Sequence, residues 1–165
     1  MTGTRLGRET LTRDPALRDA LLDLNNASAL ETSWLEAARF EHMVGQAVAA
    51  LHVPPAQALL LAFDQHADYD SPNFTWFRDR FDRFVYVDRI VVAAAVRGQG
   101  LARGLYRDLF DLARAAGHDR VTCEVNSDPP NPASDAFHAA MGFVLAGEAR
   151  LDNGKSVRYL ERRLD

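Results

Sequence analysis

Two kinds of hydrophobic pattern alternate along the chain, and the first is helical. After Asp14-Pro15, leucines recur on one side of the chain while Asp and Arg occupy the other, which predicts an amphipathic helix. The longest helical pattern runs from Gly100 to Ala116, with Gly117 where a C-cap glycine belongs. Shorter helices are predicted from Ser33 to about Met43 and from Asn131-Pro132 to about Met141.

The second pattern consists of short apolar runs bounded by turn residues, which is typical of β-strands. The predicted strands are 4–11, 46–53, 58–64, 83–92, 120–126, 142–147 and 156–164. Pro54-Pro55 and Asp152-Asn153-Gly154 are the predicted hairpin turns, and 68–77 is a loop running into a short helical turn. Strands and helices alternate in the C-terminal half, so we predict an α/β (α+β) fold with a mixed sheet.

Composition places the chain among ordinary globular proteins. Its 165 residues are 47% hydrophobic and 25% charged, which fits one domain over residues 1–165. The net charge of −4 argues against nucleic-acid binding, and no apolar run approaches the length of a membrane span. The N-terminus lacks the apolar stretch of a signal peptide, and Cys123 is the one cysteine, so we expect a cytoplasmic protein without disulfides.

The segment Arg97-Gly98-Gln99-Gly100-Leu101-Ala102 carries the clearest chemistry. Two glycines allow positive φ angles and a close approach of the backbone to a ligand. The helix that follows offers unpaired N–H groups and the positive end of its dipole, an arrangement that suits a pyrophosphate. A plain glycine turn is the alternative for such a short motif. A P-loop and a dinucleotide fingerprint are disfavoured, because the Gly-Lys-Ser/Thr sequence and the third glycine are absent.

With the strand Ile90-Val91-Val92 before it and the amphipathic helix after it, this segment resembles the acyl-CoA motif of the GCN5-related N-acetyltransferase (GNAT) superfamily. A second block, Cys123-Glu124-Val125-Asn126 followed by Asn131, Phe137-His138 and Met141-Gly142-Phe143, resembles that family's next strand and helix. The two blocks cover roughly residues 84 to 147. More narrowly, the run Tyr86-Val87-Asp88-Arg89-Ile90-Val91-Val92, with the spacing before the second helix, resembles an uncharacterised bacterial branch of predicted acetyltransferases. The resemblance implies a GNAT-like, mostly antiparallel sheet, splayed between two parallel strands and flanked by helices.

The resemblance also implies acetyl-CoA as the co-substrate and direct transfer of its acetyl group to an amine. Pantetheine would lie between the strands that end near Val92 and Asn126, and the Val92 N–H would stabilise the oxyanion. The implied coenzyme-binding residues are Ile90, Val91, Val92, Arg97, Gly98, Gln99, Gly100, Leu101, Ala102, Asn131, Ser134, Phe137 and His138. Asn131 has a second interpretation as the N-cap before Pro132.

The family's thiolate acid is commonly a tyrosine four residues before the Gly-Phe pair, and this chain has His138 there. An imidazolium can donate a proton near neutral pH, so His138 is the candidate acid. It can equally pack against the coenzyme or face solvent. The histidines show no metal-ligand spacing, and we expect no metal.

Candidate bases lie on the two central strands. Alternation places Tyr86, Asp88 and Ile90 on one face, so Asp88 could deprotonate an amine, and Glu124 is the second candidate. Asp88 can also serve only as a buried ion-pair partner. Tyr69, Asp70, Trp76 and Tyr86 are the candidate acceptor-binding residues, since carboxylates and aromatic walls suit a cationic amine. The loop 68–77 can equally be an ordinary ordered turn with a hydrophobic anchor.

We therefore expect an acetyl-CoA-dependent N-acyltransferase acting on a small-molecule or protein amine, with no nucleic-acid or membrane partner. A homodimer is compatible with the sequence. The missing tyrosine keeps a rival open, a non-catalytic acyl-CoA-binding or sensing module. A nucleotide-binding regulatory domain is the second rival.

Overall fold

The computed structural model describes residues 1–165 except for the side chain of Glu31. The helices are α1 (Arg8–Arg13), α2 (Pro15–Ala27), α3 (Ala29–Thr32), α4 (Ala37–Gln46), α5 (Pro72–Arg78), α6 (Leu101–Ala115) and α7 (Pro132–Ala140). The strands are β1 (Thr4–Arg5), β2 (Ala49–Val53), β3 (Ala58–Asp64), β4 (Val85–Val92), β5 (Arg120–Asp128), β6 (Val144–Arg150) and β7 (Ser156–Arg163). A short 3₁₀ turn, Ala94–Val96, joins β4 to the glycine segment.

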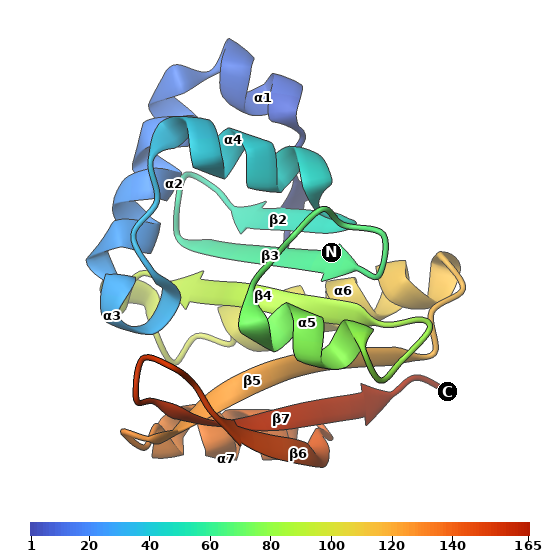
Figure 1. Ribbon diagram of the computed structural model, residues 1–165. Helices are drawn as coiled ribbons and strands as arrows, with labels where there is room; N and C mark the ends of the chain where they lie inside the picture. The colour runs from blue at the N-terminus through green and yellow to red at the C-terminus, as the bar shows by residue number, and fades with distance from the viewer.

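All strands form one sheet in the order β1-β2-β3-β4-β5-β7-β6 (Figure 1). Every neighbouring pair is antiparallel except β4 and β5, which are parallel. The predicted α/β (α+β) fold with a mixed sheet is therefore confirmed. None of the described helices has the length and apolar character that crossing a membrane requires.

The sheet is covered on both faces, and each face has its own hydrophobic core. On one face, Leu21 of α2, Phe40 of α4 and Phe74 of α5 pack with Tyr86 and Tyr159. On the other, Leu105 and Leu109 of α6 and Met141, just after α7, pack with Val87 and Cys123. Figure 1 shows α5 in front of the sheet and α6 behind it. The helical period of α6 thus buries the face that the leucine spacing predicts.

β4 and β5 pair only at their beginnings. The register matches Val85 with Val121 and Tyr86 with Thr122, and no further pair follows. From Val87 onward the two strands diverge toward their carboxyl ends, as Figure 1 shows. This confirms the splayed pair that the family resemblance implies, and it leaves the β5-facing edge of β4 open to a ligand.

A register shift in the β3–β4 pairing corrects one sequence-based prediction. Leu61 is opposite Arg89 whereas the next residue, Ala62, is opposite Val87, so Asp88 is an extra residue in β4. Such a bulge reverses the alternation of the strand beyond it. Tyr86 faces the α5 side but Ile90 packs into the α6 core, so the prediction that Ile90 shares a face with Tyr86 and Asp88 is wrong.

Two element boundaries also differ from the sequence prediction. The N-terminal strand stops at Arg5, and α1 replaces its second half, because Gly7 and Thr10 form a helix N-terminus with the Gly7 N–H donating to the Thr10 hydroxyl. The helix predicted from Ser33 begins at Ala37 instead, since Ser33 adopts a φ of 81° that ends α3. The other predicted elements lie within a few residues of their expected bounds.

Candidate active site

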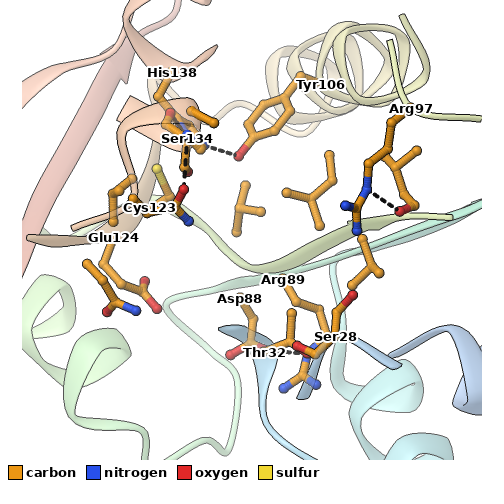
Figure 2. A pocket seen from close by; sticks show the side chains of 18 residues that line it. Ser28, Thr32, Asp88, Arg89, Arg97, Tyr106, Cys123, Glu124, Ser134 and His138 are labelled. Atoms are coloured by element: carbon orange, nitrogen blue, oxygen red, sulfur yellow. Dashed lines mark hydrogen bonds and ion pairs between the residues drawn. The ribbon is translucent and has the colours of Figure 1, made fainter. Parts of the chain in front are cut away.

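A cavity of about 390 Å³ occupies the opening between β4 and β5. Its lining comprises Val87–Val92 of β4, Cys123–Asn126 of β5, Tyr106 of α6, Asn131, Ala133, Ser134 and His138 at α7, Arg97 from the glycine segment, and Ser28 and Thr32 at the N-terminal helices. Figure 2 shows these side chains converging from the two strands and from helices on both sides of the sheet. Residues from distant parts of the sequence thus meet where the parallel strands separate.

The glycine segment has the geometry of an open anion cradle. Gly98 and Gly100 have φ of 78° and 81°, and an added Cβ at either position would meet nothing within 4 Å. No side chain caps α6, which begins at Leu101, so its first N–H groups face outward for a ligand. The Nε of exposed Arg97 donates to the Val92 carbonyl at 3.3 Å, which holds the guanidinium at the cavity mouth. These residues fit a pyrophosphate group.

Asn131 caps α7, because its side-chain oxygen accepts from the Ser134 N–H at 3.3 Å. It also lines the cavity, so the two interpretations of Asn131 are compatible. Of the other implied coenzyme-binding residues, Ile90, Val91, Val92, Ser134 and His138 also line it. Phe137 instead packs against the α6 core, with its ring 5.5 Å from that of Tyr106.

The carboxyl of Asp88 is compensated by a neighbouring cation. Its Oδ2 lies 2.7 Å from Arg89 Nε, and its Oδ1 accepts from the Tyr69 hydroxyl. Arg89 also donates to Asn25 at 2.8 Å. Both side chains of the ion pair are buried. Asp88 therefore lies at the cavity in a network that fixes its orientation and balances its charge.

The carboxyl of Glu124 is in a different environment. It accepts hydrogen bonds from the Tyr86 hydroxyl at 2.7 Å and from the Asn73 amide at 3.2 Å, and among the described residues it has no salt-bridge partner. Tyr159 donates to the other end of Asn73 at 2.9 Å. Burial raises the pKa of Glu124 to about 8, although the Tyr86 hydrogen bond opposes this shift. An uncompensated carboxyl with such a pKa is suited to accept a proton near neutral pH.

His138 lies on the opposite side of the opening. It is 5% exposed, its Nε2 is 2.7 Å from the Tyr106 hydroxyl, and its Nδ1 is 2.8 Å from the Ser134 carbonyl. Burial lowers the pKa of its imidazole. It therefore does not face solvent, and Figure 2 shows the ring directed at Tyr106.

The acceptor-binding residues predicted from sequence are placed unevenly. Tyr69 donates a hydrogen bond to the Asp88 carboxyl and Tyr86 donates one to the Glu124 carboxyl. Neither tyrosine is among the residues that line the cavity. Trp76 stacks on Tyr159 with ring centroids 4.2 Å apart, and neither it nor Asp70 lines the cavity. No group of three His, Cys, Asp or Glu residues in the described part of the chain is arranged to hold a metal.

Sequence reasoning missed several residues of this site. Tyr106 lies on the buried face of α6, where helical periodicity predicts that an aromatic residue belongs to the hydrophobic core. Ser28, Thr32 and Asn25 come from N-terminal helices that no motif connects to the cavity. Asn73 follows Pro72 in the predicted loop, and its bond to Glu124 carries no sequence signal.

Comparisons with known proteins agree with this geometry. A family model described as "Acetyltransferase (GNAT) family" matches residues 73–143, which include both central strands, the glycine segment and α7. No curated protein matches the chain in sequence.

Solved structures resemble the fold over nearly the whole chain. One is the NatC complex bound to Gag peptide and CoA, with a TM-score of 0.72, 14% identity and coverage of 99% of this chain and 98% of that one. Another is a putative acetyltransferase from Salmonella typhimurium with its cofactor acetyl-CoA (TM-score 0.68, 18% identity, 99% and 94% coverage). A third is the ribosomal-protein-S18-alanine N-acetyltransferase from Escherichia coli (0.64, 15%, 99% and 94%).

Proposed function

We propose that the chain is an acetyltransferase of the GNAT family that takes acetyl-CoA as its acyl donor and transfers the acetyl group directly to an amine, with Glu124 as the proton acceptor. The observation that carries this proposal is the separation of β4 from β5 beside the half-buried Glu124 carboxyl, which has no salt-bridge partner among the described residues. The acceptor is an amine of a small molecule or of a protein. A panel of amines, scored by release of the CoA thiol, tests the activity.

The coenzyme is proposed to lie along the open edge of β4. Gly98 to Ala102 would hold its pyrophosphate through backbone N–H groups, with Arg97 adding positive charge. The backbone of Val91 and Val92 would pair with the pantetheine arm, and the Val92 N–H would stabilise the oxyanion. Binding the thioester and the amine in one opening supplies much of the rate through proximity.

The proton from the amine is proposed to go to Glu124 and not to Asp88. The Asp88 carboxylate already has Arg89 as its counter-ion, so taking a proton would leave that guanidinium buried without its partner. Glu124 has no such partner, and an incoming ammonium would favour its charged form. Glu124 then accepts the proton, and the neutral amine nitrogen can form the new C–N bond.

On the other side of the opening, His138 is proposed as the source of the proton that the leaving thiolate takes. We expect His138→Phe to retain CoA binding and to lower turnover, because phenylalanine fills the space without a proton to give. Isothermal titration with CoA and a thiol-release assay measure the two properties. A variant with unchanged turnover would remove His138 from the reaction.

Coenzyme binding can be tested without knowing the acceptor. At 100 times its Kd, CoA is expected to stabilise the protein by about 2.7 kcal/mol. For a chain of this size, that corresponds to a rise in Tm of about 5–10 °C. ATP and NAD at equal concentration are expected to leave the Tm unchanged, because neither has a pantetheine arm to fill the cavity beside β4 and the dinucleotide fingerprint is absent. Stabilisation by ATP or NAD but not by CoA would favour a nucleotide-binding regulatory domain.

Cell location and assembly remain proposals. We propose a cytoplasmic location, where acetyl-CoA is available and the buried Cys123 thiol stays reduced. A homodimer would have a natural contact at the edge strand β6, where Val144 and Leu145 are exposed.

A further inference from the structure

The hydrogen bonds of His138 fix which of its nitrogens carries a proton. Its Nδ1 lies 2.8 Å from the Ser134 carbonyl oxygen, and a carbonyl oxygen can only accept. Nδ1 is therefore a donor in both the neutral and the charged ring. The only proton that the ring can gain or lose is on Nε2, which faces the Tyr106 hydroxyl at 2.7 Å.

The protonation of His138 consequently sets the direction of the Tyr106 hydroxyl. When the imidazole is neutral, Tyr106 donates to Nε2 and its proton points away from the cavity. When the ring is an imidazolium, Nε2–H donates to the Tyr106 oxygen, and the tyrosine proton is free to turn elsewhere. In the neutral state every donor of the pair has an acceptor, and in the charged state the Tyr106 proton becomes available to an acceptor in the cavity.

The Tyr106 hydroxyl lies between the His138 ring and the opening between β4 and β5. It comes from α6, whereas His138 comes from α7, and both line the cavity together with Cys123. Figure 2 shows the phenol crossing from α6 toward His138, with its hydroxyl at the cavity side of the imidazole. Both ring nitrogens of His138 are occupied, so a proton leaving the ring for the cavity must pass through this hydroxyl.

We propose that Tyr106 is a catalytic residue that delivers the proton to the leaving thiolate, with His138 as the source behind it. This inference rests on the proposed acetyl transfer. As the C–S bond breaks, the sulfur takes the proton of the Tyr106 hydroxyl, and the Tyr106 oxygen takes the Nε2 proton of His138. Tyr106 ends neutral, and His138 ends neutral with Nδ1 still donating to Ser134. Water returns one proton to His138 before the next turnover.

The transfer of a proton from His138 through Tyr106 to the thiolate is called the relay below, and the surroundings of His138 make it sensitive to pH. The groups packed against the ring are Tyr106 from α6, Ser134 and Phe137 from α7, and Phe143 after it. Asp135 is the charged neighbour on α7, and its carboxylate is paired with Arg158 of β7 at 3.0 Å. Because only the imidazolium frees the Tyr106 proton, we expect the acid-assisted step to slow as pH rises through the pKa of His138.

Steady-state kinetics of single and swapped variants test the relay. Tyr106→Phe is expected to lower kcat about 100-fold, a typical contribution of a positioned acid, while the KM for acetyl-CoA stays within about twofold. It should also lose the fall in kcat that His138 imposes as pH rises through the His138 pKa. In the double variant Tyr106→Phe/His138→Tyr, the family's usual phenol returns on α7, and we expect at least about 10-fold of the lost kcat to be regained.

The outcomes separate the relay from the proposed function. A wild-type protein that binds CoA but releases no thiol with any amine contradicts the acetyl transfer itself. If the wild type is active and Tyr106→Phe keeps its kcat and pH profile, the relay alone is overturned. A loss of kcat with no recovery in the double variant, when titration shows that both proteins bind CoA, indicates a packing role for Tyr106 and also overturns the relay.

Discussion

Replacing Glu124 with Gln is expected to lower kcat by about 100- to 1,000-fold, within the usual range for loss of a general base. The amide has nearly the same shape, but it cannot take a proton from the ammonium. Acetyl-CoA binding should be retained, because Glu124 contacts Tyr86 and Asn73 and lies apart from the glycine segment. Thiol release with a saturating amine measures kcat, and titration calorimetry measures CoA binding.

The pH dependence gives a sharper test of the same residue. A base works in its deprotonated form, so Glu124 should contribute a rising component to the wild-type pH profile that levels above its pKa of about 8, superimposed on the fall that the relay assigns to His138. Glu124→Gln should lack this rise. Assaying both proteins with one amine removes the titration of the amine from their ratio. A ratio that does not change with pH would exclude Glu124 as the base.

Asp88→Asn is the matched control, because it makes the same carboxyl-to-amide change across the opening. It breaks a buried pair with Arg89, so we expect a loss of about 3–5 kcal/mol in the free energy of unfolding. The folded fraction should keep the rise in rate toward pH 8. If Asp88→Asn loses that rise and Glu124→Gln keeps it, the base is Asp88.

The comparison of these carboxyls shows what the sequence could predict. Both were identifiable from their strands, because alternation and the family resemblance place them near the acyl end. Their different roles could not be predicted, since the difference comes from Arg89 beside one and from burial around the other. The bulge at Asp88 also could not be predicted, because the sequence of β4 has the pattern of a regular, uninterrupted strand.

On the coenzyme side, local signals were more informative. Glycines and a helix start are adjacent in sequence, so Arg97 to Ala102 could be identified without tertiary information. His138 was identifiable only as a departure from the expected tyrosine. Its coupling to Tyr106 depends on the packing of α6 against α7, residues 32 positions apart, and helical periodicity treats that tyrosine as ordinary core.

The last prediction concerns Gly100, where we expect Gly100→Val to abolish CoA binding. The residue has a φ of 81°, which a β-branched side chain rarely adopts, although nothing lies within 4 Å of the added Cβ. The substitution therefore acts through backbone strain and through a side chain placed in the space for the pyrophosphate. Losing two charge-assisted hydrogen bonds would raise the Kd for CoA by at least about 100-fold. Titration calorimetry measures this change.

Gly154→Val separates loss of the cradle from general strain. Gly154 has a φ of 84°, an added Cβ there also meets nothing within 4 Å, and it lies in the turn between β6 and β7. Both variants should therefore lose similar stability in thermal unfolding, while only Gly100→Val loses CoA. If Gly154→Val weakens CoA binding equally, strain in the fold explains the effect. If Gly100→Val still binds CoA with wild-type affinity, the pyrophosphate does not lie on this helix, because a valine side chain and a pyrophosphate cannot share the same space.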